Sequence, residues 1–117
     1  MNPTLRNHIG YSEAILDDNA SFDHFYRWAD LIADKLNISF TRKLDDFEAL
    51  YWDFLYKGTT LTLSYNIFNG ITVFPALEER SDYFENAAIA ELVDQLKDAS
   101  PNEAKYFFSS IVARIPA

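Results

Sequence analysis

Cysteine is absent from this chain of 117 residues, glycine occurs only three times, and no long apolar run is present. Without cysteine the chain forms no disulfide, no thiolate zinc site and no cysteine nucleophile, which is typical of a reducing compartment. The three glycines are not grouped, so they predict no phosphate-binding loop. No window approaches the roughly 20 apolar residues of a membrane-spanning helix, and no apolar stretch follows the amino terminus as in a signal peptide. We therefore expect a cytoplasmic protein without a membrane partner.

Basic residues are scarce. Ten Lys and Arg stand against eighteen Asp and Glu, which gives a net charge of −8. This is the wrong sign for holding phosphates, so nucleic acid is not expected as a partner. A field of this sign steers basic proteins toward the surface. Acidity also serves simple solubility, and composition alone leaves both interpretations open.

No group of residues predicts a catalytic or metal centre. The two histidines, His8 and His24, lack a ligand partner at helical spacing, so we expect structural or surface roles for both. No Gly-x-Ser-x-Gly turn supports a serine nucleophile, although triad residues meet in space and not in sequence. The sequence therefore predicts a non-enzymatic protein with no cofactor and no metal. A small enzyme that uses paired carboxylates is an alternative, and it would need a cleft and divergent pKa values.

The composition predicts one folded domain that spans residues 1–117. Apolar residues make up 49% of the chain, and aromatic residues are abundant, with ten Phe, seven Tyr and two Trp. Such a composition supplies a core without disulfides and argues against disorder.

A helix is predicted over Phe22–Leu36. The preceding cluster, Asp17–Ser21, holds residues that cap helix amino termini. Asn37 tolerates the left-handed conformation and is a suitable stop. One apolar stripe recurs at three and four residues, formed by Phe22, Phe25, Trp28, Ala29, Ile32 and Leu36.

Short strands are predicted on both sides of this helix. The first covers Ile9–Leu16, with Ile9, Tyr11 and Ile15 on one side. After the helix the period changes to two, with Ile38, Phe40 and Arg42 alternating against Ser39 and Thr41. Asp45-Asp46 then marks a turn.

Three consecutive antiparallel strands are predicted over Leu50–Pro75, which reads LYWDFLYKGTTLTLSYNIFNGITVFP. A two-residue turn at Lys57-Gly58 predicts a register in which one face is apolar. The predicted pairs are Tyr56 with Thr59, Phe54 with Leu61, Trp52 with Leu63, and Leu50 with Tyr65.

Asn69-Gly70 predicts the next hairpin turn, because both positions of such a turn favour positive φ. A strict two-residue loop pairs Phe68 with Ile71 and Asn66 with Val73, which turns Ile71 and Val73 away from the core face. Either a bulge corrects this register or the second face is also partly covered. Pro75 should end the pairing, since it has no amide to donate.

Two helices are predicted at the end of the chain. Ser81 and Asp82 favour the start of the first, whose inner stripe comprises Phe84, Ala88, Leu92 and Leu96, with Ile89 and Val93 alongside. Ser100-Pro101-Asn102-Glu103 predicts the start of the second. The order β-α-β-β-β-β-α-α predicts an α+β fold, an antiparallel sheet of about five strands with the helices mainly on one face.

Acidic groups and surface aromatic residues together predict a protein-binding surface. Acidic turns are usually solvated turns and caps, but collectively they suit a basic partner, with aromatic residues as anchors. The acidic candidates are Asp45, Asp46, Glu48, Asp53, Glu78, Glu79 and Asp82. The aromatic candidates are Tyr51, Tyr56, Phe68 and Tyr83. Trp52, Phe54 and Tyr65 are predicted to be core instead.

Several segments give the chain a resemblance to the small immunity proteins of bacterial contact-dependent growth inhibition and related polymorphic toxin systems. They are Tyr51-Trp52-Asp53-Phe54, Lys57-Gly58, Leu61-Thr62-Leu63 and Asn69-Gly70-Ile71, within Ile38 to Leu96. Size, acidity and the lack of cysteine agree. The resemblance implies neutralisation of a cognate toxin domain, often a basic nuclease, by covering its active site. It transfers no individual residue. The alternative from another class is a structural or regulatory homodimer that pairs through an exposed sheet edge or face.

Overall fold

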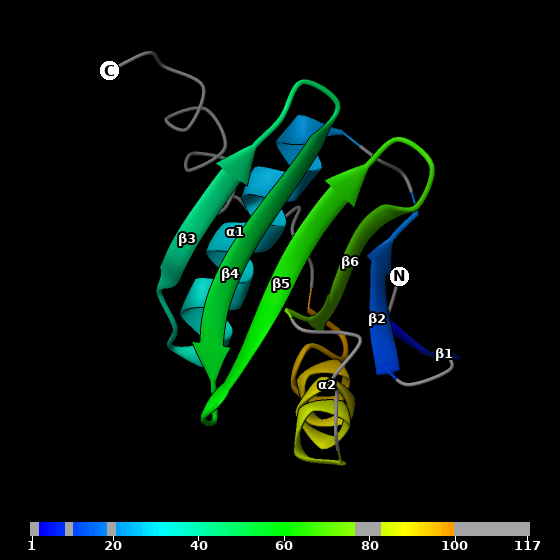
Figure 1. Ribbon diagram of the computed structural model, residues 1–117, viewed down its shortest axis with the longest axis vertical. Helices are drawn as coiled ribbons and strands as arrows, with labels where there is room; N and C mark the ends of the chain where they lie inside the picture. The colour runs from blue at the N-terminus through cyan, green and yellow to red at the C-terminus, as the bar shows by residue number, and fades with distance from the viewer. Residues whose placement is uncertain (1–2, 9–10, 19–20, 77–82, 100–117) are drawn as a thin grey trace.

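The computed structural model describes residues 3–8, 11–18, 21–76 and 83–99. Within these residues it contains one antiparallel sheet of six strands and two helices (Figure 1). In chain order the elements are β1 (Thr4–His8), β2 (Tyr11–Asp17), α1 (Phe22–Leu36), β3 (Phe40–Asp45), β4 (Ala49–Tyr56), β5 (Thr59–Asn66), β6 (Gly70–Pro75) and α2 (Tyr83–Gln95). The strand order is β1-β2-β6-β5-β4-β3. The predicted α+β class is confirmed, with six strands instead of about five. The helix predicted from Ser100 lies outside the described residues.

The additional strand is at the amino terminus. All five residues of β1 are exposed, so β1 has no apolar pattern by which a sequence would reveal it. Tyr11 and Ile15 share one side of β2 and are half-buried, whereas Ala14 and Leu16 are fully buried. Ala14 pairs with Val73 of β6, which places it on the core face. Ile9 lies outside the described residues.

The β4–β5 hairpin has the predicted register. Leu50 pairs with Tyr65, Trp52 with Leu63, Phe54 with Leu61 and Tyr56 with Thr59. Lys57 and Gly58 both have positive φ, 51° and 80°, as this tight turn requires. The apolar side chains of both strands therefore share one face, here called the core face.

The β5–β6 connection differs from the strict two-residue turn. Asn66 pairs with Gly70 and Tyr65 with Ile71, so the loop has three residues, 67–69. The Asn66 side chain accepts hydrogen bonds from the amides of Phe68 and Asn69, at 2.9 and 2.8 Å. One extra loop residue returns β6 to the core register, and Ile71 is fully buried.

β3 contains a register shift between Phe40 and Arg42. Phe40 pairs with Phe54 on the core face, whereas Arg42 pairs with Asp53 on the opposite face. The predicted alternation of Arg42 with Phe40 on one side is therefore wrong, because the irregularity at Thr41 adds a residue between them.

Both helices pack on the core face, and Figure 1 shows α1 behind the sheet. The predicted bounds of α1 are confirmed: Ser21 Oγ accepts a hydrogen bond from the His24 amide at 3.1 Å, and Asn37 ends the helix with φ 54°. Ala88, Ile89 and Leu92 of α2, and Leu96 directly after it, are buried in the same core. The other face, here called the open face, carries neither described helix.

Candidate binding surface

Two loops lie next to each other at one end of the sheet, at the top of Figure 1. Residues 46–48 connect β3 to β4, and residues 67–69 connect β5 to β6. Ala49 pairs with Asn66, so the two loops leave the sheet from neighbouring positions. We call this region the loop end; it also includes the end of β2 and the start of α1.

Phe47 and Phe68 are the most exposed large apolar residues in the described part of the chain, at 90% and 87%. Each occupies one of the two neighbouring loops, and Ile67 beside Phe68 is 58% exposed. Phe68 was predicted as a surface anchor, whereas Phe47 was not. The signal for Phe47 was present in the sequence, since it stands between Asp46 and Glu48 in a turn and cannot belong to a strand face.

Hydrogen bonds fix both loops. The Asp46 amide donates to the Ala49 carbonyl at 2.8 Å, and Asp46 Oδ1 accepts from the Phe47 amide at 2.7 Å. The second loop is held by Asn66 in the same manner. Loops with fixed backbones lose less conformational entropy on binding than disordered ones, so the two aromatic side chains are presented at a reduced cost.

The segments of the loop end carry acidic side chains and no lysine or arginine. The acidic residues are Asp17, Asp18, Asp23, Asp45, Asp46 and Glu48. The four basic residues of the two edge strands lie elsewhere, Arg6 and His8 on β1 and Arg42 and Lys43 on β3. The negative charge of the described fold is thus concentrated where Phe47 and Phe68 protrude.

The predicted acidic residues have different positions. Asp46 and Glu48 are exposed at the loop end together with Phe68. Asp45 lies at the same end, but its Oδ1 accepts a 2.7 Å hydrogen bond from Trp52 Nε1, so it also has a structural role. Glu78, Glu79 and Asp82 lie outside the described residues. Tyr83 is the first residue of α2, which Figure 1 places toward the opposite end of the sheet.

Tyr51 and Asp53 lie on the open face, half-buried. Asp53 Oδ1 accepts a 2.7 Å hydrogen bond from Thr62 Oγ1 on β5. A depression of about 270 Å³ is lined by Arg42, Leu44, Tyr51, Asp53, Thr62, Phe74 and Ala76. These residues are separate from the loop end, so the predicted surface divides into two regions.

Tyr56 is not a surface anchor, and this prediction is wrong. Its side chain is only 5% exposed because the hairpin register directs it to the core face. Burial raises its pKa above the ordinary 10.0, and the nearby Glu91 charge acts in the same direction. Lys57 forms an ion pair with Glu91 and lies over the Tyr56 ring, 5.8 Å from its centroid.

Both histidines make contacts that stabilise the fold. His8 Nε2 lies 3.0 Å from Glu13 Oε1, and its ring stacks on Tyr11 at 4.6 Å. His24 Nδ1 lies 2.9 Å from Ser21 Oγ at the start of α1. In the part of the chain that the structure describes, no three His, Asp or Glu side chains are placed to hold a metal ion. No described helix is long and apolar enough to cross a membrane.

No protein-family model, curated protein or solved structure matches this chain. The functional assignment therefore depends on the geometry and charge of the surfaces above.

Proposed function

We propose that this protein is a non-enzymatic inhibitor of the immunity type, which binds a basic toxin domain in the cytoplasm of the producing cell and covers its active site. One observation carries the proposal: Phe47 and Phe68 protrude from two neighbouring loops, of which the first, residues 46–48, is acidic. Nothing in the described core needs these two rings, because they contribute almost no buried area within the chain.

The energetics of association favour the loop end as the contact. Burying a phenylalanine side chain contributes about 1.5–3 kcal/mol, and aromatic anchors near the centre of an interface commonly dominate its affinity. The carboxylates around the two rings steer a basic protein and raise the association rate. An active site that binds phosphates is basic, so the carboxylates of the loop end complement it in charge.

The direct test measures binding of the purified chain to the toxin domain encoded beside its gene, by calorimetry and by inhibition of the toxin. Phe47→Ser with Phe68→Ser should weaken binding by at least about 100-fold, because two anchors are lost. Leu55→Ser is the matched apolar control, since Leu55 is 55% exposed near the opposite end of β4. It should leave binding unchanged.

Charge reversal tests the acidic component separately. Asp46→Lys with Glu48→Lys should slow association and reduce its salt dependence, while Asp94→Lys, an exposed position on α2, should do neither. Absence of any affinity for the neighbouring toxin contradicts the proposal. Undiminished affinity of the double phenylalanine variant removes the loop end from the interface.

The homodimer alternative is disfavoured at the β3 edge of the sheet by its charge. The outer strand β3 carries Arg42 and Lys43. Pairing two β3 edges brings these like charges together, and natural edge strands use basic residues to prevent such pairing. Light scattering of the isolated chain at tens of micromolar distinguishes the two functions. A stable dimer at this concentration would favour the homodimer over toxin binding.

A further inference from the structure

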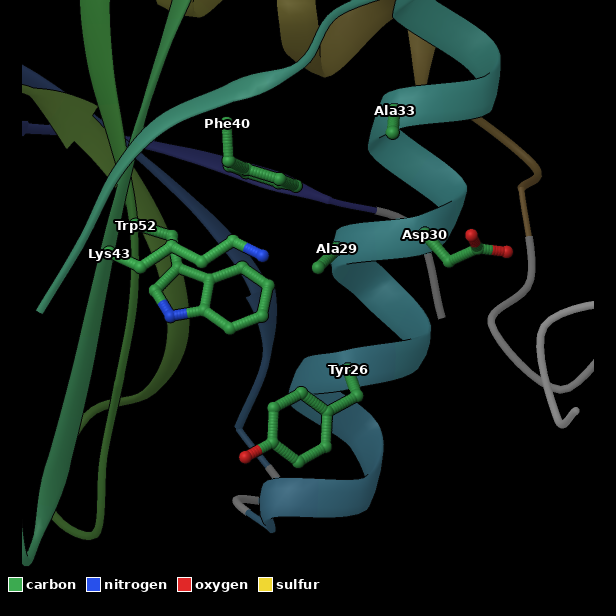
Figure 2. A pocket seen from close by; sticks show the side chains of 7 residues that line it. All are labelled: Tyr26, Ala29, Asp30, Ala33, Phe40, Lys43 and Trp52. Atoms are coloured by element: carbon green, nitrogen blue, oxygen red, sulfur yellow. The ribbon is translucent and has the colours of Figure 1, made fainter. Parts of the chain in front are cut away.

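A pocket of about 240 Å³ lies between α1 and the β3–β4 edge of the sheet, separate from the loop end. Its lining residues are Tyr26, Ala29, Asp30, Ala33, Phe40, Lys43 and Trp52, shown in Figure 2. Ala29 and Ala33 are one turn apart on α1, and their small side chains leave the space that larger residues would fill. Phe40 of β3 and Trp52 of β4 form the opposite walls, and Tyr26 borders the pocket from α1 itself.

The indole of Trp52 is held in one orientation. Its Nε1 donates to Asp45 at 2.7 Å, and the rings of Phe25 and Phe40 contact it edge-on, with centroids 5.0 and 5.3 Å away. Tyr26 adds a tilted contact at 5.8 Å. A ring fixed from several sides provides a preformed wall, as ligand pockets usually do.

Lys43 places a positive charge beside this apolar space. Its Nζ lies 4.2 Å from the centroid of the Trp52 ring. None of the described carboxylates forms an ion pair with Lys43. Figure 2 shows that the Asp30 carboxylate is directed away from the Lys43 ammonium. The ammonium therefore has a ring contact, and none of the described carboxylates lies within ion-pair distance of it.

We propose that this pocket binds a small carboxylate that carries a single apolar ring, with the ring between Trp52 and the two alanines and the carboxylate on Lys43. A cavity of about 150 Å³ holds one benzene ring, so the pocket volume of about 240 Å³ fits one ring with a short carboxylate arm. The negative charge of the carboxylate is opposite in sign to the positive charge of Lys43 at the pocket. This inference goes beyond the proposed toxin binding and does not depend on it.

The test titrates the full chain with 3-phenylpropionate and follows the indole N–H signals by NMR. Trp52 should shift in a saturable manner in the millimolar range, while Trp28, which is 1% exposed, serves as the internal reference. The neutral amide and the amine of the same carbon skeleton are titrated in parallel. Both should bind more weakly than the carboxylate, the amine most weakly because Lys43 repels it.

Three variants assign the binding to the pocket. Lys43→Met keeps the stem and should weaken carboxylate binding about two- to fivefold, as expected for an exposed charge pair. Ala33→Leu preserves helix propensity, fills the cavity and should abolish the Trp52 shift. Lys35→Met, in the last turn of α1, should change nothing. The proposal is overturned by a non-saturable shift, by equal binding in the Ala33→Leu variant, or by tighter binding of the amine.

Discussion

Trp52 and Asp45 join the core to the loop end through the 2.7 Å hydrogen bond from the indole Nε1 to Oδ1. Trp52 is 8% exposed on β4, and Asp45 is the last residue of β3. The edge strand β3 is otherwise exposed over residues 41–45, so this bond fixes its end at the point where the acidic loop begins.

Asp45→Ala should lower the free energy of unfolding by about 1–2 kcal/mol, because the indole N–H loses a charged acceptor. Urea unfolding followed by tryptophan fluorescence measures this. Asp46→Ala is the control, since Asp46 accepts a bond only within its own loop and should cost less than about 0.5 kcal/mol. Equal costs for the two variants would show that the Trp52 bond contributes nothing. Binding studies should accordingly avoid Asp45 as a charge-reversal site.

Gly70→Ala should destabilise the chain strongly, by more than about 2 kcal/mol. Gly70 has φ 73°, and an added Cβ would lie 2.2 Å from the Asp17 carbonyl oxygen at the end of β2. Gly58 provides a matched control, because its φ is 80° and nothing lies within 4 Å of an added Cβ. Gly58→Ala should therefore cost only the conformational strain of about 1 kcal/mol. Similar melting temperatures for both variants would contradict the close contact with Asp17.

The sequence could predict those parts of the fold in which pattern and turn chemistry agree. The β4–β5 register follows from Lys57-Gly58 and from strict alternation, and both indicate one pairing. The β5–β6 register does not follow from Asn69-Gly70 alone, because the Asn66 side chain accepts two loop amides and adds a residue to the turn. On β2, small Ala14 faces the core while larger Tyr11 does not, so hydrophobicity alone does not identify the core face of this strand.

The candidate binding surface could also be predicted only in part, because strand pairing decides which of its residues lie close together. Exposed acidic residues and Phe68 could be identified by residue type, but their proximity depends on the pairing of Ala49 with Asn66. The choice of Tyr56 as a surface anchor conflicts with the predicted register itself, because the pairing with Thr59 places Tyr56 on the same face as Phe54. The Lys43 ammonium over Trp52 depends on the register shift in β3, which local sequence does not reveal.

Glu13→Gln should loosen the β1 edge. Glu13 is 8% exposed, and its Oε1 accepts from Arg6 at 2.8 Å and lies 3.0 Å from His8 Nε2. The amide keeps the size but loses the charge, so β1 should open more readily while the core stays folded. Hydrogen exchange should accelerate in β1 amides by about fivefold, the equivalent of about 1 kcal/mol, with no change in β4 and β5. Uniform acceleration across the sheet would instead indicate global destabilisation.

Alkaline pH should lower the stability of the protein through Tyr56 and Lys57. Burial raises the pKa of the Tyr56 hydroxyl above 10.0, and the hydrogen bond to Glu91 raises the pKa of Lys57 above 10.5. When the folded pKa is the higher one, the stabilisation is present below the unfolded value and is lost as the pH rises through the folded value. The free energy of unfolding should therefore fall above about pH 10 for both groups.

Substitutions separate the two contributions to this alkaline loss. Tyr56→Phe removes the titrating hydroxyl and should reduce the fall in stability between neutral and alkaline pH. Glu91→Gln removes the charge that raises both pKa values and should also reduce it, whereas Asp94→Asn on the same helix should leave the pH profile unchanged. The measurement is urea unfolding at a series of pH values. A wild-type profile that stays flat through this range, or one that Tyr56→Phe leaves unaltered, would show that the buried tyrosine is not linked to folding.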